Sequence, residues 1–386
     1  MALDPETFDL LKSTLQRFVR ERLVPREDEV AETNTIPEDI RAEMRELGLF
    51  GLSIPEAFGG LGLDMEEEVN LAFELGKTSP AFRSLLGTNN GIGSQGLIMD
   101  GTDAQKEHYL PKLASGEMIA SFALTEAEAG SDARSLRTSA RRDGDDFILN
   151  GTKRYITNAP HAGLFTVFAR TEDPDNSEGS ITAFLVEAGT PGLSIGPVDK
   201  KMGQQGSLTS DVIFEDCRVP ASAVLGERTG QGFRTAMKVL DRGRLHISAV
   251  CVGAAERLIA DSLDYAMERK QFGQPIAEFQ LVQAMLADSR AEAFAARCMV
   301  LETARAKDRA EVVTTDAACC KMYASEMVGR VADRAVQIHG GAGYMSEYAI
   351  ERFYRDVRLF RIYEGTTQIQ QLVIARNMIK QRKSEL

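Results

Sequence analysis

One segment of the chain holds an isolated carboxylate in an unusual setting. The segment RIYEGTTQIQQ, residues 361–371, places Glu364 between Tyr363 and a glycine, just before an apolar run resumes. A carboxyl group that folding buries has a raised pKa, which makes it a stronger base near neutral pH. A positioned general base contributes roughly 10² to 10⁴ in rate. Position alone leaves two readings open for Glu364: a general base, or a solvent-facing acid near a helix dipole.

Four other segments combine small or polar residues with breaks in regular structure. FALTEAEAGSD (122–132) offers backbone N–H and hydroxyl groups to a polar planar ligand, and KRYITNAP (153–160) offers a tyrosine to one face of an aromatic cofactor. ERKQFGQPIAEFQ (268–280) presents Arg269 and Lys270 to an anion such as pyrophosphate. In AVQIHGGAGY (335–344) a predicted helix ends at Gly340 and Gly341, and these glycines let another group approach the backbone closely. Each segment alone also has an ordinary reading, as a loop, a cross-strand pair or a helix end.

Other candidate motifs point to no chemistry. GIGSQG at 91–96 has the glycine spacing of a dinucleotide fingerprint, but it lies between helical patterns rather than after a strand, so it predicts a helix break. The five cysteines form no CxxC pair and show no zinc spacing, and the four histidines are isolated, so no metal site is expected. Four of the five cysteines sit among apolar residues and are expected to be buried.

The patterns along the chain predict three regions that would position these segments. Residues 1–120 have helical periodicity, residues 121–227 contain short β-branched runs separated by turn signals, and residues 228–386 return to long helical patterns. We expect an α+β protein: a helical domain, a β-barrel or sandwich, and a four-helix bundle.

Local signals predict where several helices begin and end. Thr35 is a candidate N-cap for a helix that stops at Gly48, and TDAQ at 102–105 has capping-box spacing. Thr367 and Gln370 show the same spacing, so a helix is predicted to start near Thr367. Glu364 would then lie just outside that helix, on a glycine hinge.

Composition restricts the partners. The 386 residues carry a formal charge of -12, which disfavours nucleic acid and anionic membranes, although a local basic pocket for an anionic small molecule remains possible. No run approaches the roughly 20 apolar residues needed to span a bilayer. The N-terminal segment lacks the apolar region of a signal peptide, so a cytoplasmic location is expected.

Taken in order, these segments resemble the acyl-CoA dehydrogenase family. LTEAEAGSD is similar to the T-E-P-G-A-G-S-D signature of that family, YITN to its W-I-T-N, and IYEGTTQIQ to its C-terminal catalytic segment. LDRGR, ERKQFG and QIHGGAGY also match in order and at comparable spacing. The resemblance covers nearly the whole chain. It implies FAD as cofactor, an acyl-CoA substrate, electron-transfer flavoprotein as partner, and a homotetramer.

The resemblance also implies roles for individual residues. Glu364 takes the position of the base that removes the α proton while the β hydride passes to flavin N5, and its backbone N–H would polarise the thioester carbonyl together with a ribityl hydroxyl. The residues expected at the flavin and the CoA entrance are Phe122, Leu124, Thr125, Gly130, Ser131, Tyr155, Thr157, Thr366 and Gln368. Those expected to hold the FAD of a neighbouring subunit are Arg269, Phe272, Gln280, Gln337 and Gly341. Those expected in the substrate pocket are Ser131, Asp241, Arg244, Tyr363 and Gly365.

Several positions depart from the family pattern or refine it. Ala127 and Glu128 replace the usual Pro-Gly, Phe122 replaces a tyrosine, and Tyr155 replaces a tryptophan. A subset of the family carries its base at the position of Gly243, and a glycine there agrees with Glu364 as the base.

Arg83 aligns with an arginine that glutaryl-CoA dehydrogenases use for a distal carboxylate, so a dicarboxylic acyl-CoA is an alternative substrate. Further alternatives are an acyl-CoA oxidase or flavin monooxygenase of the same fold, and a non-catalytic scaffold that has kept the fold. Glu364 argues against a monooxygenase, which needs no α-proton base.

Overall fold

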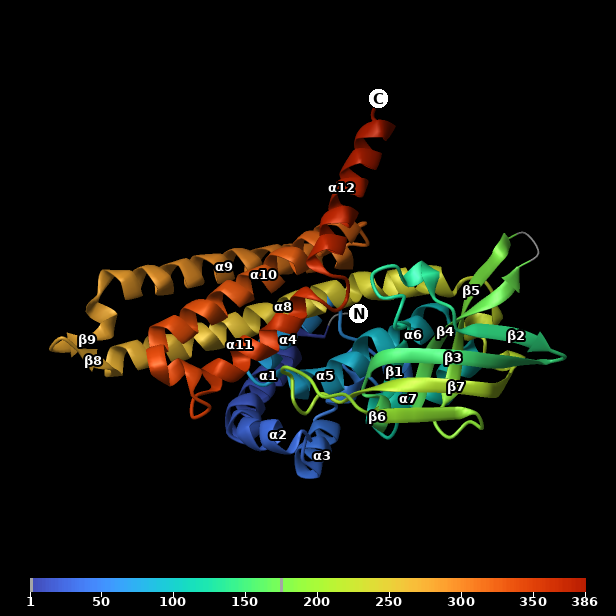
Figure 1. The fold of residues 1–386 in the computed structure, drawn as a ribbon, viewed down its shortest axis with the longest axis horizontal. Coiled ribbons are helices and arrows are strands. Elements are labelled where there is room, and N and C mark those ends of the chain that lie inside the picture. Colours follow the sequence, from blue (N-terminus) through green and yellow to red (C-terminus); the bar gives the residue numbers. More distant parts are fainter. Residues whose placement is uncertain (1–2, 174–175) are drawn as a thin grey trace.

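The computed structural model describes residues 3–173 and 176–386. Helices come first, then a sheet, then long helices (Figure 1), so the predicted order is confirmed. Within the described residues, no helix combines the length and the apolar character needed to cross a membrane. The helices of the first region are α1 (Pro5–Phe18), α2 (Glu27–Thr33), α3 (Glu38–Glu46), α4 (Met65–Leu75), α5 (Pro80–Thr88), α6 (Gln95–Asp100) and α7 (Asp103–Ser115).

The ends of these helices follow the predicted signals in part. Thr102 and Gln105 form the predicted capping box of α7, and Gly48, with a φ of 67°, terminates α3 in a left-handed conformation. The prediction of Thr35 as the cap of α3 is wrong, because the N-cap is Pro37. A proline disfavours helical backbone in the residue before it, so the helix cannot begin earlier.

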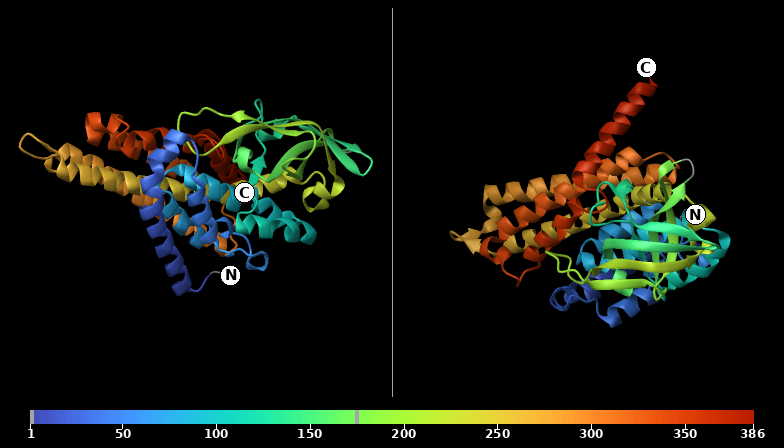
Figure 2. Two further views of the ribbon diagram at one scale, coloured as in Figure 1. Left: turned by 90° about the horizontal axis from the view of Figure 1, so that it is seen from below. Right: turned by 45° about the vertical axis from the view of Figure 1, so that its right-hand side comes forward.

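The middle region is one curled, mixed sheet. Its strands are β1 (Ala120–Ala123), β2 (Ser139–Asp143), β3 (Asp146–Thr157), β4 (Leu164–Asp173), β5 (Asn176–Glu187), β6 (Leu193–Val198) and β7 (Thr209–Pro220). The hydrogen-bonded order is β1-β4-β2-β3-β7-β6, with β5 also paired to β4. β1 runs parallel to β4, while β3 and β7 are antiparallel. The sheet lies at the opposite end of the molecule from the small hairpin of β8 (Lys270–Gln271) and β9 (Gln274–Pro275) (Figures 1 and 2).

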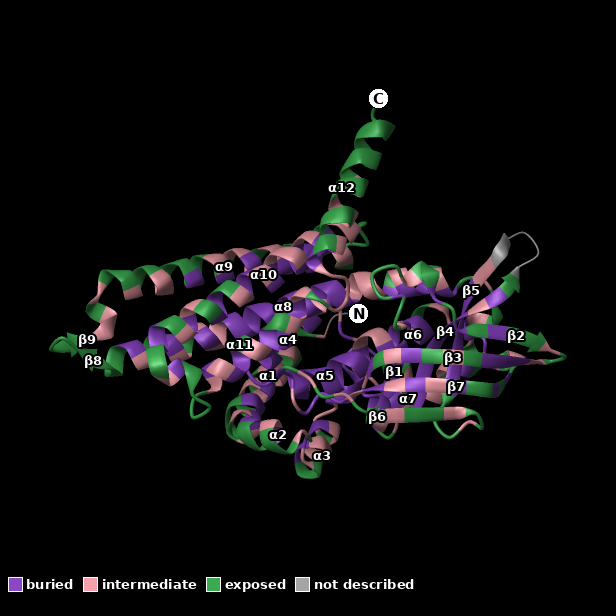
Figure 3. Cartoon of the chain, viewed as in Figure 1, coloured by how far each residue is buried: buried purple, intermediate pink, exposed green. Residues whose placement is uncertain are grey.

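The last region is a bundle of long helices. Its elements are α8 (Gly232–Glu268), β8 (Lys270–Gln271), β9 (Gln274–Pro275), α9 (Gln280–Asp308), α10 (Thr314–His339), α11 (Ala349–Val357) and α12 (Thr367–Ser384). α8, α9, α10 and α11 share one apolar core, to which α4 of the first region also contributes. α12 projects away from the bundle, and most of its surface is exposed (Figures 1 and 3).

The cysteines are less buried than their apolar neighbours in sequence suggest. Cys217, Cys251 and Cys320 are buried, but Cys319 is half-buried and Cys298 is exposed. The expectation of four buried cysteines is therefore wrong. Cys298 lies on α9 (Gln280–Asp308) and Cys319 on α10 (Thr314–His339), and a helix turns part of an apolar run away from the core.

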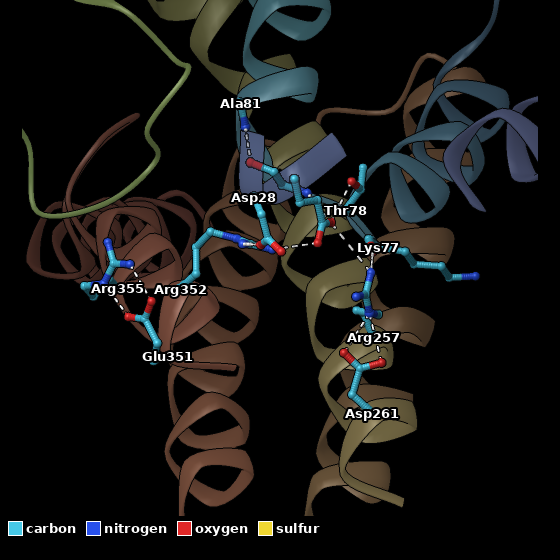
Figure 4. Close-up of polar contacts among 11 residues, drawn as sticks. Asp28, Lys77, Thr78, Ala81, Arg257, Asp261, Glu351, Arg352 and Arg355 are labelled. Atoms are coloured by element: carbon cyan, nitrogen blue, oxygen red, sulfur yellow. Dashed lines mark hydrogen bonds and ion pairs between the residues drawn. The ribbon is translucent and has the colours of Figure 1, made fainter. Parts of the chain in front are cut away.

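A buried ionic network joins the first region to the bundle (Figure 4). Glu27 of α2 is only 2% exposed, and its carboxylate accepts hydrogen bonds from Arg352 Nη2 of α11 at 2.7 Å and from the Thr78 hydroxyl at 2.7 Å. Arg257 of α8 lies 3.6 Å from the same carboxylate. Removing one partner of a buried ion pair leaves an uncompensated charge, which is strongly destabilising.

We predict that Arg352→Met lowers the free energy of unfolding by about 3 kcal/mol, because Glu27 would remain buried without its main partner. Thermal and urea unfolding would measure the change. Arg382→Met, which removes the exposed pair with Glu385, is the control and should change stability by less than about 1 kcal/mol. Equal effects of the two substitutions would contradict the assigned role of the network.

Candidate active site

A large cavity lies where the sheet meets α5, α8 and the segment that leads into α12. Its volume is about 690 Å³, within the range of small-molecule and cofactor sites. Segments far apart in sequence meet there. The predicted site residues that line it are Arg83, Phe122, Leu124, Thr125, Gly130, Ser131, Tyr155, Thr157, Arg244, Tyr363, Glu364 and Gly365.

The cavity is basic, although the whole chain is acidic. The positively charged residues in its wall are Arg83, Arg134, Lys201, Arg244 and Arg376, against the acids Asp132 and Glu364. A cleft lined by one sign of charge raises the local concentration of oppositely charged ligands. The site is therefore suited to an anionic ligand.

Glu364 lies on a tight turn between α11 and α12. Its φ is 52° and that of Gly365 is 88°, so two successive residues are left-handed. The side-chain amide of Gln370 donates to the carbonyl oxygens of both residues at 3.1 Å, and Lys321 Nζ of α10 donates to the Gly365 carbonyl at 2.6 Å. We call residues 363–366 the Glu364 turn. Side chains from two helices hold its backbone in a strained conformation.

The carboxylate of Glu364 faces the cavity without a hydrogen bond. Its Oε2 atom is buried and has no partner among the described residues. Burial raises the pKa of Glu364, while the charges of Arg83, Lys321 and Arg244 act in the opposite direction. A buried, unpaired carboxyl with a raised pKa is the state expected of a general base.

Gly243 of α8 makes room for this carboxylate. A Cβ atom added at Gly243 would overlap Glu364 Oε2. Glu364 thus occupies the space that a side chain at position 243 would take. An acid at position 243 and an acid at position 364 would compete for the same space, which agrees with the resemblance, where the base occupies one position or the other.

Arg83 of α5 lines the same two pockets as Glu364. It is 5% exposed, and its Nε and Nη2 atoms donate to His246 Nδ1 at 3.2 and 2.7 Å. Because a guanidinium cannot accept a hydrogen bond, Nδ1 is the acceptor, and burial together with Arg83 lowers the pKa of His246. The imidazole is therefore neutral. A Cβ atom at Gly87 would come within 2.7 Å of Arg83 Nε, so glycine leaves space for the guanidinium.

A second, smaller pocket continues beyond Glu364. It is lined by leucines of the first region together with Arg83, Arg242 and His246, and its free volume is about 20 Å³, close to that of one water molecule. Arg242 is paired with the buried Glu68 of α4 at this pocket. The space is small and partly polar.

Other predicted site residues lie outside the main cavity. Thr366 caps α12 with its hydroxyl, so the N-cap is one residue before the predicted Thr367, although the helix starts at Thr367 as expected. Asp241 pairs with Arg244 at 2.6 Å, and Gln368 is exposed on α12. Five residues lie towards the other end of the bundle, around the β8–β9 hairpin and the ends of α9 and α10 (Figure 1): Arg269, Phe272, Gln280, Gln337 and Gly341.

The structure adds residues that sequence reasoning did not select. Phe233 and Met237 of α8 line the cavity. The Arg134 guanidinium lies over the Phe233 ring, 4.7 Å from its centroid. Gln204 enters the wall from the loop before β7, and Lys321 lies behind the Glu364 turn. Their segments carry no local signal, since a helical phenylalanine or lysine is common on any helix.

Comparison with known proteins identifies three matching domains. They are the acyl-CoA dehydrogenase N-terminal domain at residues 5–117, the middle domain at 121–217 and the C-terminal domain at 230–379. The chain is 42% identical over 374 residues to an acryloyl-CoA reductase (NADH) of Anaerotignum propionicum, covering 96% of this chain and 94% of the relative. It is 42% identical over 371 residues to a probable acyl-CoA dehydrogenase of Bacillus subtilis, covering 96% and 97%. It is 41% identical to the CarC subunit of the caffeyl-CoA reductase-Etf complex of Acetobacterium woodii, covering 92% and 93%.

Solved structures of similar fold support the same family. Butyryl-CoA dehydrogenase from Megasphaera elsdenii superposes with a TM-score of 0.93 at 35% identity, covering 98% of this chain and 99% of that one. A glutaryl-CoA dehydrogenase in complex with glutaryl-CoA has a TM-score of 0.92 at 33% identity, covering 98% and 96%. An acyl-CoA dehydrogenase of Bacillus anthracis complexed with FAD has a TM-score of 0.91 at 34% identity, covering 100% and 69%. The chain belongs to the acyl-CoA dehydrogenase family, and the predicted fold and enzyme class are confirmed.

We predict that Gly243→Ala slows turnover of an acyl-CoA tenfold or more while the protein stays folded, because the added methyl group would displace the flexible end of Glu364. Single-turnover absorbance measurements and a thermal melt would check both parts. Gly96→Ala is the control, because the nearest atom to its added Cβ lies at an ordinary 3.4 Å. An unchanged rate in Gly243→Ala would contradict the placement of the carboxylate.

Proposed function

We propose that the chain catalyses α,β-dehydrogenation of an acyl-CoA thioester to the trans-2-enoyl-CoA, with Glu364 as the base. The observation that carries this proposal is the Glu364 carboxylate, whose Oε2 atom has no hydrogen-bond partner in the described residues, in a basic cavity also lined by residues of the segment 122–132. The proposed acceptor of the electrons is electron-transfer flavoprotein. A relative that is a subunit of a reductase-Etf complex supports that partner.

The main cavity fits FAD. It offers the exposed ring of Tyr155, the small residues Gly130 and Ser131, and an excess of positive charge that suits a pyrophosphate. Arg244 lines it with an Nε atom that has no hydrogen-bond partner among the described residues. FAD supplies the hydride acceptor when it is bound. Phe122, Leu124, Thr125 and Thr157 would line its ring system.

The proton step belongs to the Glu364 turn. With its raised pKa, the Glu364 carboxylate can accept the α proton of the thioester at its free Oε2 atom. Its backbone N–H donates to no acceptor in the described part of the chain and is available to the thioester carbonyl. Such a donor stabilises the negative charge that develops on that oxygen as the proton leaves.

The substrate is proposed to have a short acyl group. The pocket beyond Glu364 has a free volume of only about 20 Å³, so a long chain would have to displace leucines packed in the first region. Relatives named for acryloyl-CoA and butyryl-CoA support this length.

A second copy of the chain is proposed to complete the site. Phe272 is 94% exposed on the β8–β9 hairpin, and Arg269, Gln280, Gln337 and Gly341 lie in the same end of the bundle. Large exposed apolar side chains near polar groups are typical of an interface. The resemblance assigns these residues to the FAD of a neighbouring subunit in a tetramer.

A dicarboxylic acyl-CoA is a second candidate substrate, favoured by one observation. Arg83 is buried in the wall of both pockets beside Glu364, with a neutral histidine as its hydrogen-bond partner rather than a carboxylate. A buried guanidinium without an acid can receive the terminal carboxylate of a short substrate. The neighbouring structure with bound glutaryl-CoA supports this candidate.

We predict that Glu364→Gln lowers the rate of flavin reduction by an acyl-CoA by at least about 10²-fold, because the amide keeps the shape but cannot accept the proton. Anaerobic stopped-flow spectroscopy would measure the decay of the flavin band. Glu302→Gln, an exposed α9 site, is the matched control. A near-parental rate in Glu364→Gln would rule out the base assignment.

The same protein preparations distinguish the dehydrogenase from an oxidase and from a non-catalytic scaffold of the same fold. A colourless protein that cannot be reconstituted with FAD would support a scaffold. Fast reoxidation of the reduced flavin by oxygen would support an oxidase, and slow reoxidation with fast transfer to electron-transfer flavoprotein supports the dehydrogenase.

We predict that Arg83→Met lowers kcat/KM for a glutaryl-type thioester about 10²-fold more than for butyryl-CoA, since one charged hydrogen-bond partner is worth roughly 1.5 to 3 kcal/mol. The ratio of the two substrates cancels the effect of Arg83 on Glu364. Steady-state kinetics with both thioesters would measure it. Equal losses on both substrates would exclude the dicarboxylate.

A further inference from the structure

A buried lysine lies behind the Glu364 turn. Lys321, in the first third of α10, is 0% exposed, and its Nζ donates to the Gly365 carbonyl oxygen at 2.6 Å. In the part of the chain that the structure describes, this ammonium forms no ion pair. Burying a charge without a counter-ion is costly, so a lysine at this position is poorly explained by packing alone.

The acceptor of this hydrogen bond is part of the proposed active site. Gly365 follows Glu364 directly, and Glu364 has a left-handed backbone that a non-glycine residue of a free chain would populate rarely. Gln370 of α12 bonds the same carbonyl from one side, and Lys321 bonds it from the other. The direction of the Glu364 side chain depends on this backbone geometry.

The charge of Lys321 also acts on Glu364. Burial lowers the pKa of Lys321 to about 8, and the positive charge of Arg244 lowers it further. Cys251, Glu364 and Glu326 act in the opposite direction and raise this pKa. Lys321 is therefore cationic at neutral pH. Facing Glu364 are Arg83 from α5, Arg244 from α8 and Lys321 from α10, and each of these cations favours its ionised form.

We propose that Lys321 is a positioning residue for Glu364: its ammonium fixes the Glu364 turn through the Gly365 carbonyl and helps keep the base ionised. This inference rests on the proposed function of Glu364. Lys321 touches neither cavity wall, so it acts on the reaction through the turn and through its charge.

Two substitutions separate these effects. Lys321→Met removes both charge and donor, and Lys321→Gln removes the charge while its amide can still bond the carbonyl. Replacing a buried ion with an apolar side chain of similar volume is often neutral for stability, so both variants are expected to fold. Lys380→Met, at an exposed position on α12, is the control.

The expected result is a shift in the pH dependence of kcat/KM. Without the cation, the pKa of Glu364 rises, so its carboxylate forms at higher pH and the acid limb moves up by about one unit in both variants. At pH values where Glu364 is ionised, Lys321→Met is expected to remain about tenfold slower than the parent, and Lys321→Gln to recover. Lys380→Met should follow the parent curve.

Amide hydrogen exchange of residues 362–370 gives a readout independent of activity. Faster exchange in Lys321→Met than in Lys321→Gln supports the proposal that Lys321 fixes the Glu364 turn through the Gly365 carbonyl. Unchanged exchange and an unchanged acid limb in both variants would overturn the inference. If the flavin of the parent were bleached by none of the acyl-CoA thioesters, the proposed function would fail instead, so the two failures are distinguishable.

Discussion

The site depends on a short piece of strained backbone held by hydrogen bonds to its carbonyls. Residues in sparsely populated conformations cost about 1 to 3 kcal/mol each and persist only where their surroundings compensate. Here Lys321 and Gln370 bond the carbonyls of the Glu364 turn, and Gly243 leaves the volume that the carboxylate occupies. Three helices thus determine the direction of one side chain.

Buried charges have two different roles in this protein. Glu27 is surrounded by donors and joins α2 to α8 and α11, so its charge is compensated and its role is structural. Glu364 has no partner within the described chain, and Arg83 and Lys321 bond a histidine and a carbonyl instead of an acid. These charged groups, none of which has a hydrogen-bonded counter-ion in the described residues, gather around the Glu364 turn, and such a cluster is typical of a functional site.

The names of the relatives describe both directions of one reaction. Some are called dehydrogenases, whereas others are called reductases of acryloyl-CoA or caffeyl-CoA. Under the proposed function, a carboxylate that removes an α proton would return it in the reverse direction, so the Glu364 turn would serve both directions. The net direction depends on the reduction potentials of the substrate and of the electron partner, to which residues outside this cavity contribute.

Local sequence was sufficient for much of the architecture and for selecting Glu364 as a candidate base. Periodicity predicted the helical and β regions, the Thr102–Gln105 box predicted the start of α7, and Glu364 stood out because a glycine hinge and a helix start flank it. These signals are read within a few residues, where short-range backbone preferences dominate. Even so, the α3 cap was misplaced, because the restriction imposed by Pro37 outweighed a favourable threonine.

Only the packed chain brought the distant groups together. Arg83 of α5, His246 of α8 and Lys321 of α10 meet around Glu364 from separate regions, and no spacing in the sequence connects them. Burial also changed their chemistry, since the pKa shifts of His246 and Glu364 are caused first by desolvation. Desolvation arises from the whole fold, so a linear sequence specifies which acid is present but not the environment that would make it the proposed base.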